Sequence, residues 1–135
     1  MNEAVILCVD DETVILESLL EQISRHFGEQ FSYEAAESAE EALEILEDLH
    51  EEGIKIVVIV SDWLMPGMRG DEFLVQVHQR FHDITTIMLT GQADEEAIER
   101  AKEEANLYCC IYKPWQEEEL INIISRGLEL GETSQ

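Results

Sequence analysis

Short, almost continuously apolar segments alternate with helical segments along the whole chain, and this alternation restricts the fold more than any other feature. Apolar residues dominate at 4–9, 54–60, 85–90 and 108–112, as is typical of strands buried on both faces. Residues 31–36 instead alternate apolar and polar side chains, which indicates a strand at a sheet margin. Five strands alternating with five helices predict an α/β domain, a parallel sheet covered by helices on both faces.

Each segment between or after the strands carries apolar residues at helical spacing. Ser38 and Glu41 have the spacing of a capping box, so we expect the second helix to begin there and Gly53 to follow its end. The five predicted apolar faces consist of Leu16, Leu19, Leu20, Ile23 and Phe27; Ala39, Ala42, Leu46 and Leu49; Phe73, Leu74, Val77 and Phe81; Ala97, Ile98, Ala101 and Ala105; and Leu120, Ile121, Ile124 and Leu128.

Length and charge restrict the class of protein further. With 135 residues, the chain can bury one continuous core, and we assign residues 1–130 to one domain and 131–135 to a polar C-terminal tail. The 31 acidic and 8 basic residues give a formal net charge of −23, which disfavours direct contact with nucleic acid or an anionic membrane. We see no signal peptide and no apolar run long enough to span a bilayer, and expect a cytoplasmic protein.

Polar side chains stand at the ends of four predicted strands. Asp10 and Asp11 follow the first strand, Asp62 the third, Thr90 the fourth and Lys113 the fifth. A doubly wound sheet binds ligands outside the carboxyl ends of its strands, so these side chains should converge. Neighbouring carboxylates repel by about 4 kcal/mol per contacting pair at an effective dielectric near 20, and their hard oxygens suit Mg²⁺. A carboxylate nucleophile beside a metal, an ammonium and a hydroxyl suits phosphoryl transfer.

The same residues lie in four motifs, VDDE at 9–12, SDWLMPGMRG at 61–70, MLTGQAD at 88–94 and YKPW at 112–115. In this order and spacing, the motifs resemble those of the receiver domains of two-component response regulators. The resemblance covers essentially all of residues 4–130. It implies a flavodoxin-like (βα)5 fold, a doubly wound parallel five-stranded sheet with strand order 2-1-3-4-5.

The resemblance also implies which residues hold the metal and accept the phosphoryl group. Asp62 would attack the phosphoryl group of a phosphohistidine on a sensor histidine kinase or a phosphotransfer protein. Asp11 and Asp62 would bind Mg²⁺ directly, and Asp10 would reach it mainly through water. The backbone carbonyl of Leu64 would complete the protein ligands.

Two further residues complete the site that the resemblance implies. The hydroxyl of Thr90 would move to hydrogen-bond the phosphoryl oxygens, and the ammonium of Lys113 would pair with them. Such a domain is not an enzyme in the usual sense, because it catalyses only its own phosphorylation and dephosphorylation. Its partners would be the kinase and an output domain or downstream protein, and a homodimer linked to phosphorylation is a further candidate.

The loop after the predicted nucleophile must bend sharply. Pro66 fixes one backbone angle in this loop, and Gly67 and Gly70 permit unusual angles. Gly70 also lets the next helix begin close to the strand end. We expect Met65 and Met68 to pack against the core rather than to contact a ligand.

One position departs from the family pattern. Receivers usually carry an aromatic residue three positions before the lysine, whose rotation reports phosphorylation, and this chain has Cys110 there. We expect the neighbouring Tyr108 and Tyr112 to point away from Cys110. The switch would then depend on Thr90, the loop after it and the fourth helix.

Three other functions fit part of the pattern. A flavodoxin-type electron carrier would share the fold and the acidity, but the carboxylates of DDET after the first strand would repel a flavin phosphate. A magnesium-dependent phosphatase with an aspartyl nucleophile would normally have a second acid two residues later, where this chain has Leu64. A degenerate receiver would serve only for docking, yet all the phosphorylation residues are present.

Cysteines and histidines offer weaker candidates for chemistry. Cys8, Cys109 and Cys110 have no metal-ligand spacing, and we expect reduced thiols that pack as small apolar residues. His78 and His82 are four residues apart on the third predicted helix, a spacing that could hold a metal. We expect them instead at an exposed helix end.

Overall fold

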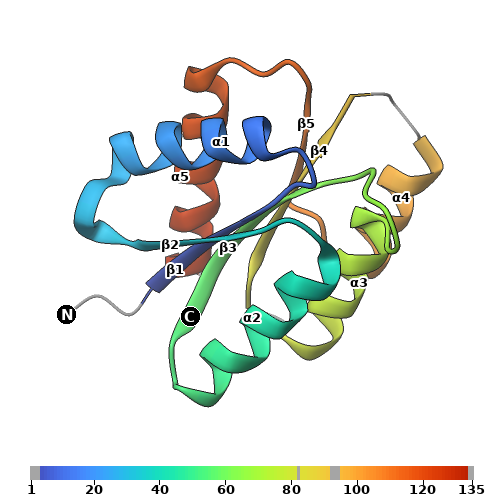
Figure 1. Cartoon of the computed structure of the whole chain (residues 1–135), viewed down its shortest axis with the longest axis horizontal. Helices are drawn as coiled ribbons and strands as arrows, with labels where there is room; N and C mark the ends of the chain where they lie inside the picture. The colour runs from blue at the N-terminus through green and yellow to red at the C-terminus, as the bar shows by residue number, and fades with distance from the viewer. Residues whose placement is uncertain (1–3, 82, 92–94, 134–135) are drawn as a thin grey trace.

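The computed structural model describes residues 4–81, 83–91 and 95–133. Its five strands form one parallel sheet in the order β2-β1-β3-β4-β5, which confirms the predicted fold class and strand order (Figure 1). The strands are β1 (Ala4–Val9), β2 (Ser32–Ala36), β3 (Lys55–Asp62), β4 (Thr85–Thr90) and β5 (Cys109–Tyr112). The helices are α1 (Thr13–Phe27), η1 (Gly28–Gln30), α2 (Ala39–Glu51), α3 (Gly70–Arg80), α4 (Glu95–Glu104) and α5 (Glu117–Thr133).

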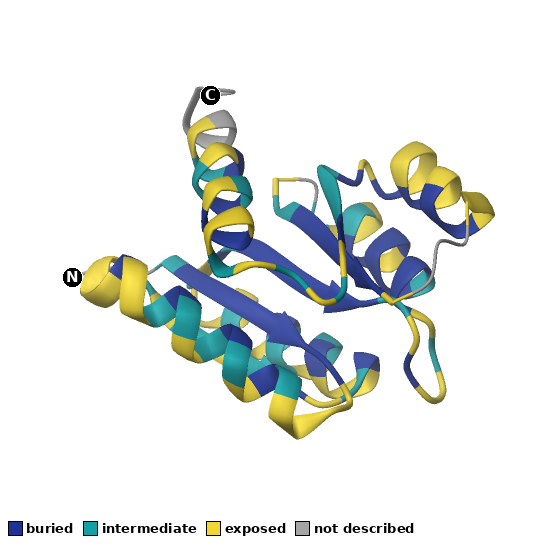
Figure 2. Cartoon of the chain, turned by 90° about the horizontal axis from the view of Figure 1, so that it is seen from above, coloured by how far each residue is buried: buried dark blue, intermediate teal, exposed yellow. Residues whose placement is uncertain are grey.

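Helices cover both faces of the sheet. Helices α1 and α5 lie on one face and α2, α3 and α4 on the other (Figure 1). Successive β1 residues alternate between the two cores: Ile6 packs with α1 and α5, and Leu7 with α2, α3 and α4. The central strands β1, β3 and β4 are buried over most of their length, and the helices expose their outer faces (Figure 2). Burial on both faces requires predominantly apolar side chains in these strands.

Local signals explain where α2 begins and ends. The Ser38 hydroxyl accepts a hydrogen bond of 3.1 Å from the Glu41 backbone N–H, as the capping box predicts. The helix ends at Glu51, and Gly53 follows with φ of 76°, a left-handed conformation that glycine adopts without a Cβ clash. Both predictions for this helix are confirmed.

The edge strand agrees with the sequence prediction, whereas the last helix is longer than predicted. Strand β2 lies at an edge and exposes alternate side chains, as predicted. Helix α5 continues to Thr133, three residues into the segment that the sequence suggested as a tail. In the described part of the chain, no helix combines the length and apolar character needed to cross a membrane.

The strand registers bring the carboxyl ends of the central strands to one level. Val9 lies opposite Ser61, Asp62 opposite Leu89, and Thr90 opposite Tyr112. The residues that follow β1, β3, β4 and β5 therefore meet along one edge of the sheet.

Candidate functional site

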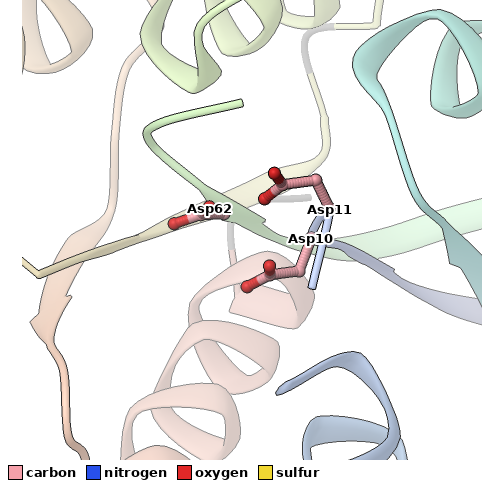
Figure 3. A group of neighbouring side chains, drawn as sticks. All are labelled: Asp10, Asp11 and Asp62. Atoms are coloured by element: carbon pink, nitrogen blue, oxygen red, sulfur yellow. The ribbon is translucent and has the colours of Figure 1, made fainter. Parts of the chain in front are cut away.

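Three carboxylates meet at the carboxyl edge of the sheet. Asp10 and Asp11 follow β1, and Asp62 is the last residue of β3. One carboxylate oxygen from each lies within 4.8 Å of the others, and Figure 3 shows the three side chains grouped at the ends of these two strands. Asp10 and Asp62 are buried, and Asp11 is exposed. The predicted convergence of the three acids is thus present in the structure.

Lys113 supplies the positive charge at this cluster. Its Nζ donates to Asp62 Oδ1 at 2.9 Å and to Asp10 Oδ2 at 3.3 Å. Its backbone N–H donates to the carbonyl of Thr90 at 2.8 Å, which fixes the start of the loop after β5. Within the described ranges, no other basic side chain forms an ion pair with these acids.

The charges at the cluster do not balance, and the pKa values reflect this. Burial raises the pKa of Asp62, the nearby Asp10 and Asp11 raise it further, and the hydrogen bond from Lys113 only partly opposes them. Burial alone would lower the pKa of Lys113, but its contacts with Asp62 and Asp10 outweigh burial and raise it. Three carboxylates against one ammonium leave an excess of negative charge in a half-buried place, and such an oxygen-rich set fits a hard divalent cation.

Thr90 is buried at the end of β4, directly beyond the residue that pairs with Asp62. Its carbonyl accepts the hydrogen bond from the Lys113 N–H, and it occupies the strand-end position that the sequence predicted. Residues 92–94, the end of the MLTGQAD motif that contains Thr90, lie outside the described residues. The predicted role of this loop in switching therefore stays a prediction.

The loop after Asp62 turns sharply, as predicted, but its two glycines contribute in different ways. Gly67 has φ of 89°, whereas Gly70 has no positive φ and is needed for space. A Cβ at Gly70 would collide with the carbonyl oxygen of Asp62 and lie 2.8 Å from the Cα of Trp63. The Gly70 N–H also donates to the carbonyl of Trp63 at 2.6 Å, so α3 begins directly against the end of β3.

Side chains in this loop divide between core and solvent. Met65 is buried and Met68 packs against the same core, as predicted. Leu64 is 64% exposed, which makes it one of the few large apolar residues in the described part of the chain that face solvent.

The environment of Cys110 confirms one expectation about its neighbours and corrects another. Cys110 packs with α2, α3 and α4, whereas Tyr108, just before β5, packs with the opposite core. The expectation was wrong for Tyr112, because residues two apart on a strand share a face; Tyr112 is half exposed beyond Cys110.

The thiols have environments that suppress reactivity. Burial raises the pKa of Cys8 to about 12, and it also raises the pKa values of Cys109 and Cys110. Thiolates are therefore scarce at neutral pH, which agrees with packing roles. The proposed pair of histidines cannot be placed together, since residue 82 lies outside the described residues.

Some features of the site were not apparent in the sequence. The carboxylate of Asp10 also accepts from the Glu12 N–H at 2.9 Å, so this acid shapes the turn into α1 as well as the cluster. Asp71 is fully buried at the start of α3 between two arginines. An acid directly after a helix-starting glycine was the only available signal for it.

A family model described as the response regulator receiver domain matches residues 6–125 of the chain. The chain belongs to this family. As a receiver domain of two-component response regulators, it has the flavodoxin-like fold and the acidic edge described above.

Curated relatives of this receiver are longer proteins. The hydrogenase transcriptional regulatory protein HoxA of Cupriavidus necator is 35% identical over 95% of this chain, which covers 25% of that protein. The hybrid signal transduction histidine kinase D of Dictyostelium discoideum is 28% identical over 89% of this chain and 7% of its own length. The receiver thus spans a quarter or less of these relatives.

Solved structures have the same fold over nearly the whole chain. A CheY-like response regulator receiver domain protein from Methanospirillum hungatei is 30% identical, with a TM-score of 0.86 and 98% of both chains covered. The signal receiver domain of an HD domain-containing protein from Pseudomonas fluorescens is 29% identical, with a TM-score of 0.85, covering 96% of this chain and 98% of that one.

Proposed function

We propose that this receiver accepts a phosphoryl group on Asp62 while Mg²⁺ is bound beside it. The observation that carries the proposal is the meeting of three carboxylates within 4.8 Å, with Lys113 Nζ 2.9 Å from Asp62. Asp62 stands at the edge of the sheet, where a donor can approach. Lys113 already contacts one oxygen of the Asp62 carboxylate.

The metal would be held by oxygen ligands from two strand ends and one loop. Asp11 and Asp62 would bind directly, Asp10 would act mainly through water, and the backbone carbonyl of Leu64 would complete the protein ligands. When bound, Mg²⁺ offsets the carboxylate repulsion and stabilises negative charge on the transferred group. The exposed Leu64 side chain leaves this stretch of backbone near solvent.

With Mg²⁺ bound, the transfer needs only residues of this chain and a phosphohistidine donor. An Asp62 oxygen attacks phosphorus, an O–P bond forms, and the N–P bond to the donor imidazole breaks. The imidazole keeps the electron pair of the broken bond. Lys113 and the Thr90 hydroxyl donate to the phosphoryl oxygens, and later attack by water on phosphorus restores the carboxylate.

The donor would be a sensor histidine kinase or a phosphotransfer protein that docks over the carboxyl edge. The exposed large apolar side chains of the described residues, Val14, Leu64 and Tyr112, all belong to or follow the ends of β1, β3 and β5. Each therefore lies close in sequence to the carboxyl end of a strand, in a protein that is otherwise strongly acidic. Apolar side chains exposed near the acidic cluster would add to the contact with a docking partner.

The output lies in a partner or in sequence beyond this domain. Residues 1–130 would act as the receiver within the cytoplasm, and the transcriptional regulators among its relatives favour an attached output domain. Because Cys110 occupies the usual aromatic position, the signal would pass through Thr90, the loop after it and α4. A homodimer linked to phosphorylation would use the same elements.

Intact mass measurement with acetyl phosphate and Mg²⁺ tests the proposal. The native chain should gain one phosphoryl group, and it should gain none with excess EDTA or as Asp62→Asn. Asp11→Asn should gain it slowly, and excess Mg²⁺ should partly restore the rate. If the native chain gains nothing, the proposal fails and a docking role replaces it.

Release of phosphate separates a receiver from a phosphatase. A receiver turns over acetyl phosphate only as fast as its own acyl phosphate hydrolyses. Rapid release of inorganic phosphate from a phosphorylated serine or sugar substrate, lost in Asp62→Asn, would favour the phosphatase reading.

A further inference from the structure

Asp71 is a buried acid with an unusual pair of partners. It lies in the first turn of α3 and its side chain is fully buried. Arg69, in the loop after Asp62, donates to Asp71 Oδ2 at 3.1 Å. Arg100, from α4, places its Nη1 3.7 Å from the same oxygen. One carboxylate therefore connects the loop that follows the phosphoacceptor to the fourth helix.

The hydrogen bonding of Asp71 is incomplete. The 3.7 Å separation from Arg100 is a charge contact but is too long for a hydrogen bond. The other oxygen, Oδ1, is buried and has no hydrogen-bond partner within the described ranges. Buried carboxylates normally have several partners, so a closer approach of Arg100 would be favourable.

Arg100 also forms an ion pair with a second acid. Its Nε donates to Glu104 at 2.7 Å, four residues later on the same helix. Glu104 is exposed at the end of α4, whereas Asp71 belongs to α3, which lies beside α4 (Figure 1). The guanidinium is thus divided between a contact within α4 and a contact that ties α4 to α3.

Asp71 is connected to the phosphoacceptor through one closely packed glycine. Asp71 follows Gly70, which packs directly against the backbone of Asp62 and Trp63. At its other end, α4 follows the loop after Thr90. A force between Arg100 and Asp71 therefore acts between α3, which begins against the backbone of the proposed nucleophile, and α4, which follows the proposed switch hydroxyl in the sequence.

We infer that Arg100 and Asp71 form an adjustable ionic latch between α4 and α3, with Glu104 as the competitor for Arg100. The inference rests on the proposed phosphorylation of Asp62 and assigns its regulation. A tighter latch holds α4, and with it Thr90, against movement toward the phosphoryl group. A looser latch lets Thr90 move more readily, so phosphorylation becomes faster.

Two substitutions on α4 should act in opposite directions. Arg100→Gln removes the latch, and we expect amide exchange in residues 95–104 to rise about two- to fivefold, together with the rate of phosphorylation by acetyl phosphate. Glu104→Gln frees Arg100 for Asp71, and both rates should fall by a similar factor. Neutralising Glu104 should not weaken α4 by itself, because an acid at a helix C-terminus is unfavourable.

Matched controls separate the latch from a general effect of charge. Lys102→Gln and Glu103→Gln make the same changes of charge on exposed positions of the same helix, and should leave both rates unchanged. In the Arg100→Gln background, Glu104→Gln should have no further effect. This double variant tests the competition without altering the buried acid. In a folded Asp71→Asn variant, Arg100→Gln should no longer change either rate.

The two measurements decide different questions. Changes of the same sign in Arg100→Gln and Glu104→Gln, or equal effects in the controls, would overturn the latch. Opposite changes in exchange with identical phosphorylation rates would overturn its regulatory role. If the native protein takes up no phosphoryl group, the proposed function fails, while amide exchange still decides whether the latch exists.

Discussion

Replacing Asp62 with asparagine should stabilise the protein in the absence of divalent cations. The substitution keeps the shape of the side chain and an oxygen acceptor for Lys113, but it removes one of three clustered negative charges. The expected sign is opposite to that of most substitutions of buried residues.

The separations in the cluster give the magnitude. At 4.8 Å, the largest separation, and an effective dielectric of 20, Asp62 is repelled by about 3.5 kcal/mol by each of Asp10 and Asp11. At 2.9 Å, Lys113 attracts it by about 6 kcal/mol. Repulsion wins by about 1 kcal/mol, and the cost of burying the charge adds to it. A gain of 1 kcal/mol corresponds to about 3–4 °C in Tm for a domain of this size.

The gain should depend on pH in a defined way. Because burial raises the pKa of Asp62 in the folded protein, the folded state binds this proton more tightly than the unfolded state. The contribution of Asp62 to stability therefore falls as pH rises from its ordinary value of about 3.9 through the raised pKa. The advantage of Asp62→Asn should be full at neutral pH and absent below the ordinary value.

Thermal unfolding with EDTA at pH 7 and at pH 3 measures both effects. Asp48→Asn is the matched control, because it removes one exposed acid away from the cluster and reports only the effect of overall charge. A Tm for Asp62→Asn equal to or below that of the native protein at pH 7 would show that the attraction of Lys113 dominates, and would refute the reasoning.

Four further substitutions or conditions follow from the same geometry. Saturating Mg²⁺, at about 100 times its Kd, should stabilise the native protein by about 2.7 kcal/mol and Asp62→Asn by much less; equal shifts in Tm would place the metal elsewhere. Lys113→Gln should cost about 3–5 kcal/mol in the free energy of unfolding, measured with urea, because it leaves buried carboxylates unpaired; unchanged stability would contradict this pairing. Since contacts with Asp62 and Asp10 raise the pKa of Lys113, its stabilisation should be complete below its ordinary pKa of about 10.4 and lost as pH rises through the raised value; an equal alkaline loss in Lys113→Gln would assign it to other groups. Gly70→Ala should cost about 1–3 kcal/mol and slow phosphorylation, because the added Cβ collides with the Asp62 backbone, whereas Gly53→Ala, where a Cβ meets nothing but φ is 76°, should lower stability without slowing phosphorylation.

The fold was predictable because strands that are buried on both faces have almost continuously apolar sequences. Strands β1 and β3 have no polar alternation, since helices cover both sides of each. The edge strand β2 shows alternation for the opposite reason. Capping at Ser38 and the left-handed Gly53 are local signals that depend on few neighbours, and both were predictable.

The acidic cluster was predictable from topology alone. Parallel strands end along the same edge, so acids after β1 and β3 must approach one another, and Lys113 after β5 joins them. Strand alternation places Tyr112 on the same face as Cys110, contrary to the expectation from the sequence. Tyr108 does not follow this alternation because it precedes the strand.

Contacts between helices could not be predicted from the sequence patterns. The pairing of Asp71 with Arg100 joins α3 to α4, and it depends on the packing of the two helices rather than on any spacing along the chain. The need for glycine at position 70 is similar, because the clash is with a backbone that only the folded loop brings near. A fully buried charge at Asp71 could not be distinguished from an ordinary acid in the first turn of a helix.

The most direct measurement of the central claim is the chemical identification of the modified side chain. Treatment with acetyl phosphate and Mg²⁺, followed by borohydride reduction and peptide mass analysis, converts an aspartyl phosphate to homoserine. We predict homoserine at position 62, dependent on the cation. Homoserine at position 10 or 11, or the same yield with EDTA, would contradict the account of this receiver.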